Sequence, residues 1–451
     1  MGAGTAQGGA CLLISGKVRK NMEFVVFAGV LLLLFIFMIV QELIQTKNQE
    51  KLFKKYLREN YGKEPPKEYS LERFARLGSY LERHKEEKQL DDITWNDLGM
   101  DEVFRRIDRT YSAAGEEYLY YTLRNISCGR EALEHLEEVV NWLQEQENIK
   151  VRIQLLMKRL GHLGKYSLYD YLDNLDYLGE RSNRKIVLGN LLYLPFLLLL
   201  FVQPAMGTIG IVLCMLWHIM TYFREKKVIE PYIISFAYVL RLIDVCEELE
   251  KQKIPVYRRE LDELREALKS LRELRRGAYW VMAGNQGKIG GNPLDILADY
   301  LRMILHLDIF QFNRMLEKLR KKTGQVENML AITGYLDMAI SVGGFRKSLE
   351  GYCIPKLEED TEKAFLHMKK GWHPLLSQPV KNSIRADRGI LLTGSNASGK
   401  STFLKMVAVN AVLAQTIHTC AAESYHAPIF QIFSSMALRD SMENGESYYI
   451  V

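Results

Sequence analysis

Three long runs without a charged residue constrain this chain most, because a bilayer accepts only helices or closed barrels with fully bonded backbones. The first, Phe24–Val40, would extend about 26 Å as a helix, which approaches a bilayer's hydrocarbon thickness of about 30 Å. The others are Ile186–Val202 and Met206–Phe223, and only the uncharged segment Gln203–Ala205 separates them. We therefore predict three transmembrane helices, of which the last two form a hairpin.

Each run also has another interpretation. The first could belong to a cleaved signal peptide, although no small-residue cleavage site follows Val40. The paired runs could instead form a buried helical hairpin in a soluble core. Met22 could be the true start of the protein, in which case residues 1–21 would not belong to it.

Basic residues on both sides of the hairpin predict its orientation. They are Arg181, Arg184 and Lys185 before it, and Arg224, Lys226 and Lys227 after it. Because basic flanks remain in the cytoplasm, both ends of the hairpin are predicted to lie there. Residues 42–185 and 224–451 would then share the cytoplasm, and the expected location is the cell membrane, with several spans.

The remaining composition is that of an ordinary folded protein. The 60 basic and 55 acidic residues give a net charge of +5, too small a bias to indicate nucleic acid by itself. The six cysteines are far apart and include no C-x-x-C pair. This spacing argues against a disulfide framework or a zinc site and favours a reducing compartment.

A phosphate-binding pattern, G-x-x-x-x-G-K-[ST], occupies Gly394–Ser401 between a predicted strand, Gly389–Thr393, and a predicted helix, Lys400–Thr419. Its glycines allow backbone N–H groups to surround phosphates, and the start of the helix adds the positive end of its dipole. We expect Lys400 to neutralise the β- and γ-phosphates and the Ser401 hydroxyl to ligate Mg²⁺.

Hydrolysis needs further groups. A second strand is predicted at Pro428–Ser435, but no apolar strand ending in an acidic magnesium partner follows it before Val451. The acids at hand lie in a glycine-containing loop and are Asp440, Glu443 and Glu446. The chain is therefore predicted to bind ATP and Mg²⁺ without a complete catalytic set, although a longer product could be an ATPase.

Several segments resemble the MutS family. Residues 393–402 resemble its P-loop, T-G-x-N-x-x-G-K-S-T, and His373-Pro374-Leu375 is similar to the segment that opens its ATPase domain. The ATP-binding residues thus implied are Gly394, Ser395, Asn396, Ala397, Ser398, Gly399, Lys400, Ser401 and Thr402. Residues 440–449 resemble the signature loop, which implies that Ser447 reaches the nucleotide of a partner subunit. Residues 109–115 resemble the turn that opens the helical core.

The resemblance implies a homodimer that closes as a clamp when ATP binds, with DNA as a candidate ligand, as in DNA mismatch repair. The expected fold is a mainly α-helical core and lever region with three transmembrane helices, followed by the first half of an α/β P-loop NTPase domain. The chain departs from the family in three ways. It has no mismatch-reading domain, the hairpin interrupts the helical core, and it stops before the Walker B strand, as a truncated product would.

The predicted organisation has seven parts. They are an N-terminal tail (1–21), a transmembrane helix (22–41), a charged helical stalk (42–90), the first part of the core (91–185), the hairpin (186–223), the second part of the core with the lever (224–360) and the N-terminal half of the ATPase domain (361–451). In the second part, the basic residues of Pro255–Arg276 are interpreted as a solvated helix end rather than a phosphate-contacting patch. The functional alternative is a membrane scaffold that uses ATP as a dimerisation switch without DNA. A transport ATPase is disfavoured by the small number of spans.

Overall fold

The computed structural model describes residues 37, 40–41, 44–63, 69, 71–86, 88–126, 129–164, 166–275, 300–359, 364–395 and 398–436. The chain divides into two units, residues 1–61 and 62–451. In the first unit, residues 44–60 are helical and lie within the range predicted for the stalk. The first predicted transmembrane helix, 22–41, lies almost wholly outside the described residues.

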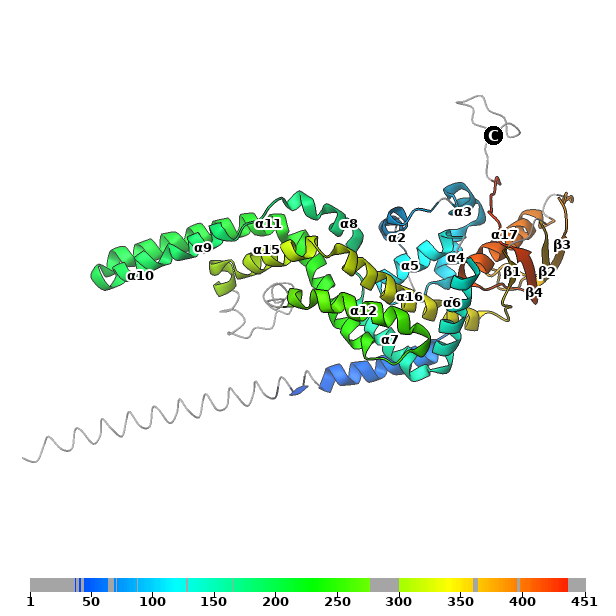
Figure 1. Cartoon of the computed structure of the whole chain (residues 1–451), viewed down its shortest axis with the longest axis horizontal. Helices are drawn as coiled ribbons and strands as arrows, with labels where there is room; N and C mark the ends of the chain where they lie inside the picture. Colours follow the sequence, from blue (N-terminus) through cyan, green and yellow to red (C-terminus); the bar gives the residue numbers. More distant parts are fainter. Residues whose placement is uncertain are drawn as a thin grey trace, which may run out of the picture. The chain divides into compact units, whose positions relative to one another are not determined.

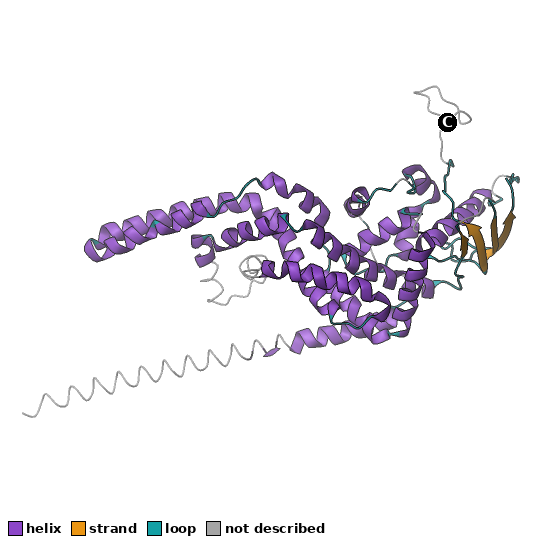
Figure 2. Ribbon diagram, viewed as in Figure 1, coloured by secondary structure: helices purple, strands orange, loops and turns teal. Residues whose placement is uncertain are grey.

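Helices dominate the second unit, which confirms the mainly helical class (Figure 2). Those before and within the hairpin are α2 (Leu71–Arg83), α3 (Asp92–Leu98), α4 (Met100–Ile107), α5 (Ala113–Arg124), α6 (Gly129–Glu145), α7 (Glu147–Leu160), α8 (Leu168–Asp173), α9 (Arg184–Leu191), α10 (Tyr193–Val202) and α11 (Pro204–Glu250). Those after it are α12 (Arg258–Leu271), α15 (Leu307–Arg320), α16 (Thr323–Ser348) and α17 (Lys400–Ile417), and short 3-10 turns join several of them.

Helix α16 is the centre of the helical core and packs against α4, α5, α6, α7, α11 and α12. Most of its residues from Val326 to Arg346 are buried, including polar ones. Each buried polar group requires a hydrogen-bond partner. The Ser341 hydroxyl donates to the carbonyl of Ile107 and accepts from the N–H of Arg109, both at 2.8 Å. Polar residues of α16 thus fix the turn before α5.

The turn at residues 109–115 has a clear physical basis. The Asp337 carboxylate accepts hydrogen bonds from the N–H of Tyr111 at 3.0 Å, the N–H of Ser112 at 2.9 Å and the Ser112 hydroxyl at 2.6 Å. Ser112 in turn caps α5 by accepting from the N–H of Gly115. A Cβ at Gly115 would lie only 2.4 Å from an Asp337 oxygen, so the glycine of the turn leaves room for this carboxylate.

The predicted hairpin is present, with α10 alongside the first half of α11 (Figure 1). Glycines allow the close approach, since a Cβ at Gly207 would lie 2.7 Å from the backbone of Leu200, and one at Gly210 would lie 2.1 Å from the Phe196 ring. Leu192 separates α9 from α10, because Pro195 cannot donate a backbone hydrogen bond to Leu191.

Two helical stretches in the described residues are long and apolar enough to cross a membrane, Arg184–Val202 and Pro204–Glu250. Only 6% of the most apolar part of the first is buried, and Phe201 is 88% exposed. Helix α11 does not end with the hairpin. It is 47 residues long and continues through Pro231 to Glu250, so the predicted third span and the start of the second part of the core form one helix.

Beyond α16 the chain forms a four-stranded sheet in the order β1-β4-β2-β3. The strands are β1 (Lys356–Glu358), β2 (Leu366–Gly371), β3 (Asn382–Ala386) and β4 (Ser424–Pro428). β4 runs parallel to β1 and antiparallel to β2, while β2 and β3 are antiparallel. The first three strands are not predicted by the sequence, because they are short and none is a continuous apolar run.

Both strand predictions for the C-terminal region were wrong in position. Residues Gly389–Thr393 pair with no described strand, and Leu391 is 88% exposed. An apolar run becomes a strand only where a neighbouring strand satisfies its backbone N–H and C=O groups. Among the described strands, β3, which precedes this run, pairs with β2 alone, and none pairs with the run itself. The strand predicted at Pro428–Ser435 is instead β4, which ends at Pro428.

Candidate nucleotide-binding site

The described part of the glycine-lysine pattern at Gly394–Ser401 leads directly into α17, which begins at Lys400 as predicted. Gly399 is the N-cap, with a φ of 83°, a left-handed conformation that a glycine adopts without strain. The N–H of Phe403 donates to the Gly399 carbonyl at 2.9 Å and closes the first turn. Since first-turn N–H groups lack partners inside a helix, the helix presents donors toward the loop.

The lysine of the pattern is held against this loop. Lys400 Nζ donates to the carbonyl oxygens of Gly394 and Ser395, both at 2.6 Å. A Cβ at Gly394 would lie 2.9 Å from the Ser398 hydroxyl, so a side chain there would be crowded. Glycine is therefore favoured at Gly394 for steric reasons and at Gly399 for its left-handed conformation. The structure therefore brings Lys400 and the loop glycines together.

Not every predicted binding residue is described. Ser401 and Thr402 lie exposed in the first turn of α17. Asn396 and Ala397 lie outside the described residues, as does the whole signature loop with Ser447. The acids Asp440, Glu443 and Glu446 lie outside them too, and no metal-binding cluster occurs in the described part of the chain.

The His-Pro segment lies at the end of β2 and is fixed to α17. His373 is 7% exposed, and burial together with the charge of Lys405 lowers its pKa. The N–H of Leu375 donates to His373 Nδ1 at 3.3 Å, as a neutral imidazole allows. Asn410 of α17, which no sequence pattern singles out, donates to the Trp372 carbonyl at 3.0 Å and holds the segment beside α17.

After Ile429, whose N–H still donates to the Glu358 carbonyl of β1 at 3.0 Å, side chains hold the segment that leads toward the predicted signature loop. Gln415 of α17 bonds both backbone groups of Phe430, accepting at 3.1 Å and donating at 2.8 Å. Asp97 of α3 accepts from the Ser434 hydroxyl at 2.9 Å and from the N–H of Met436 at 2.6 Å. Neither Gln415 nor Asp97 belongs to a recognisable pattern, so only the fold reveals them.

The opposite end of α17 is held by Arg346 of α16, whose side chain is fully buried. Its guanidinium donates to the carbonyls of Ile417 and His418, at 3.3 and 3.0 Å, and forms an ion pair with Glu137 at 2.7 Å. Burial alone would raise the pKa of Glu137, but hydrogen bonds from His418 and Arg346 lower it to about 2. A buried cation thus complements the negative end of the α17 dipole.

Comparison with known proteins adds independent information. Residues 390–451 match the family model of MutS domain V. The DNA mismatch repair protein MutS of Acholeplasma laidlawii is 32% identical over 146 residues, which cover 31% of this chain and 17% of that protein. MutS of Listeria monocytogenes serotype 4a is 31% identical over 146 residues, covering 30% and 16%. MutS of Thermotoga maritima is 31% identical over 121 residues, covering 25% and 15%.

The matched stretch thus spans about a sixth of the length of the curated relatives. The family match includes the loop at Gly394–Ser401 and the first turns of α17, where the structure holds Lys400. Residues 390–451 are thus similar to MutS domain V, and about a third of this chain is similar to these DNA mismatch repair proteins.

Proposed function

We propose that this chain is a membrane-anchored ATP-binding protein of the MutS type, which dimerises around ATP and Mg²⁺ and clamps DNA. The observation that carries the proposal is the position of Lys400, the first residue of α17, with its ammonium held against the phosphate-binding loop. The proposed binding of DNA is supported by the comparisons, since the matched relatives are DNA mismatch repair proteins.

The residues present suit a nucleoside triphosphate. The first-turn N–H groups of α17 and the Lys400 ammonium supply positive charge to the β- and γ-phosphates. The exposed Ser401 hydroxyl is available to Mg²⁺. In the dimer, Ser447 of each subunit is proposed to reach the nucleotide of the other.

The membrane part of the proposal has its own support. The hairpin exposes large apolar residues along its length, among them Leu198, Phe201, Leu213 and Met220. Contiguous apolar surface of this extent would be costly in water. We propose that the hairpin and residues 22–41 span the cell membrane, with the helical core and the ATP-binding part in the cytoplasm.

Nucleotide binding is tested by titrating the detergent-purified chain with a fluorescent ATP analogue. Lys400→Ala is expected to weaken binding at least about a hundredfold, because two phosphates lose their main cation. Lys356→Ala is the matched control, since it removes an exposed lysine of β1. Equal affinity of the two variants would overturn the proposal.

The second candidate is a membrane scaffold that uses ATP as a dimerisation switch without binding DNA. One observation favours it, since several basic residues of α12 are already paired with acids. Arg265 pairs with Glu250 at 2.7 Å, and Lys269 pairs with Glu266 at 2.6 Å. This supports the solvated helix end expected for that segment.

DNA titration at several salt concentrations separates the two candidates. A clamp that contacts phosphates releases counterions, so its affinity should fall steeply and linearly on a logarithmic plot against salt. A flat response in the presence of ATP would favour the scaffold.

A further inference from the structure

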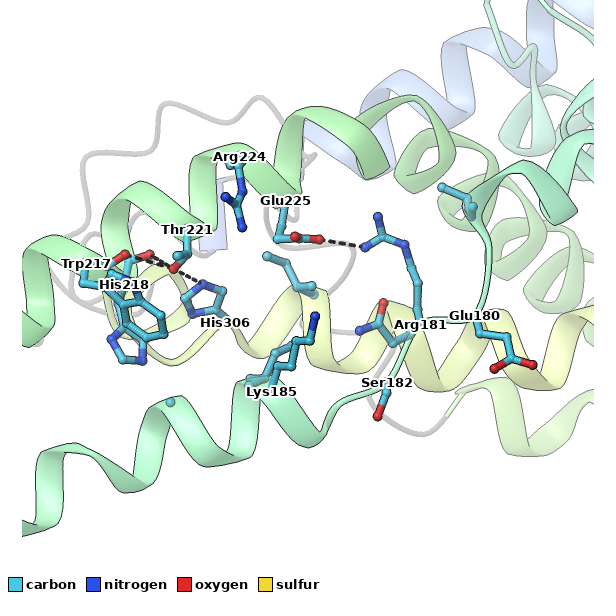
Figure 3. Close-up of a pocket in the computed structure, with 15 residues that line it drawn as sticks. Glu180, Arg181, Ser182, Lys185, Trp217, His218, Thr221, Arg224, Glu225 and His306 are labelled. Atoms are coloured by element: carbon cyan, nitrogen blue, oxygen red, sulfur yellow. Dashed lines mark hydrogen bonds and ion pairs between the residues drawn. The ribbon is translucent and has the colours of Figure 1, made fainter.

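A cavity of about 390 Å³ lies at the base of the hairpin, lined by α9, α11, α15 and the loop before α9 (Figure 3). None of its residues belongs to the nucleotide-binding site. Its charged and aromatic lining includes Arg181, Lys185, Trp217, Arg224 and Glu225.

The cavity carries unneutralised positive charge. Arg181 forms an ion pair with Glu225, Nη1 to Oε2, at 3.1 Å, so these two charges offset each other. Lys185 and Arg224 are exposed and have no ion-pair partner among the described residues. The remaining acid in the wall is the exposed Glu180. Figure 3 shows Lys185 approaching from α9 and Arg224 from α11.

The cavity also lies where the apolar surface of the hairpin ends. Leu188, about one turn after Lys185 on α9, is 65% exposed, and Met220, about one turn before Arg224 on α11, is 73% exposed. Trp217 at the cavity wall is half exposed. Tryptophan and basic residues gather where a membrane meets water, so the cavity would open at that interface.

We propose that this cavity binds the phosphate headgroup of an anionic phospholipid, whose acyl chains lie along the exposed apolar side of the hairpin. The inference rests on the proposed membrane location. Lys185 and Arg224 donate to the phosphate oxygens, and the planar guanidinium of Arg224 suits a two-point contact. The Arg181–Glu225 pair joins the loop before α9 to α11 and maintains the shape of the cavity. Free phosphate would meet the same cations but could not use the adjoining apolar surface.

Native mass spectrometry of the detergent-purified chain tests this assignment, with phosphatidylglycerol and phosphatidylcholine offered together. The wild type should retain phosphatidylglycerol selectively, and the double variant Lys185→Gln/Arg224→Gln should lose at least about tenfold of that retention. The matched control, Arg184→Gln/Lys227→Gln, removes two basic charges from the same flanks but outside the cavity wall. It should change retention by less than about twofold.

Each outcome bears on a distinct claim. Equal losses in the two double variants would overturn the site, since general attraction to basic flanks would then explain the selectivity. Displacement of the lipid by an equal concentration of inorganic phosphate would also overturn it, in favour of a soluble anion. Membrane insertion is measured separately by alkaline extraction from phosphatidylcholine vesicles. Extraction of the chain from these vesicles would overturn the proposed membrane location. A chain that stays inserted but shows no lipid selectivity would overturn only the headgroup site.

Discussion

Two carboxyl groups of the core, the buried Glu117 and the half-buried Glu137, make the stability of the fold depend on pH in opposite directions. Glu117 is buried beside Ser167, whose hydroxyl donates to Oε2 at 2.8 Å. Burial raises the pKa of Glu117 to about 8, so the folded chain holds a proton there that the unfolded chain releases near pH 4.5. This group therefore stabilises the fold at low pH, and the contribution is lost as pH rises from about 4.5 to about 8.

Glu117→Gln should remove this loss, because the amide stays neutral and its oxygen still accepts from Ser167. We expect the variant to exceed the wild type by about 1–3 kcal/mol in free energy of unfolding near pH 8, and to differ little near pH 5. Urea unfolding across this range measures it, with the exposed Glu131→Gln as control. Parallel pH profiles for the wild type and Glu117→Gln would contradict the assignment.

The buried side chain of Arg346 forms several hydrogen bonds and one ion pair. Arg346→Met leaves Glu137 without its buried partner and the carbonyls of Ile417 and His418 without that donor. A loss of roughly 3–5 kcal/mol is expected, as for other broken buried pairs. Chemical unfolding measures it, and a loss below about 1 kcal/mol would show that the pair is dispensable.

The pH dependence gives a second readout for Arg346. The lowered pKa of Glu137, about 2, means that its stabilising contribution is complete above the unfolded value of 4.5 and is lost as pH falls toward 2. Arg346→Met should reduce this loss of stability at acidic pH. Arg106→Met serves as the control, because it removes an arginine that donates to the Ser348 hydroxyl at 3.1 Å. It should leave the loss of stability at acidic pH unchanged.

At the scale of elements, the hairpin depends on glycine contacts that leave no room for a side chain. Gly210→Ile would force α10 and α11 apart, since even a Cβ would lie 2.1 Å from the Phe196 ring. We expect a cost of about 1–3 kcal/mol from overpacking, measured as a lower melting temperature in detergent. Ala205→Ile adds a larger side chain at an exposed position of the same helix. Equal losses in both variants would mean that the interface is not the cause.

Elements that follow a local rule could be predicted from the sequence, and those that depend on distant partners could not. The apolar runs predicted the hairpin, and the glycine-lysine pattern predicted the start of α17 at Lys400. The short strand β1 exists because β4, far along the chain, pairs with it. Likewise, Asn410, Gln415 and Arg346 look unremarkable in the sequence, because their bonds reach residues that only the fold brings near.

Across the whole second unit, a continuous set of contacts joins the proposed membrane hairpin to the proposed nucleotide loop. Helix α11 runs from the hairpin into the core, where it packs against α16. Arg346 of α16 holds the C-terminal end of α17, and Lys400 stands at its other end. A role of these helices in coupling the two ends would appear as a coupling energy between mutations at the hairpin and mutations at the loop.

The dimer itself offers the sharpest test of the proposed assembly, because each site would combine Lys400 of one subunit with Ser447 of the other. Lys400→Ala and Ser447→Ala should each abolish ATP-dependent dimerisation when present alone. A mixture of the two variants should partly restore it, since a heterodimer with two-fold geometry retains one intact site. Analytical ultracentrifugation with ATP and Mg²⁺ measures the restoration. If Ser447 served the nucleotide of its own subunit, both sites of the heterodimer would be defective and no dimer would return.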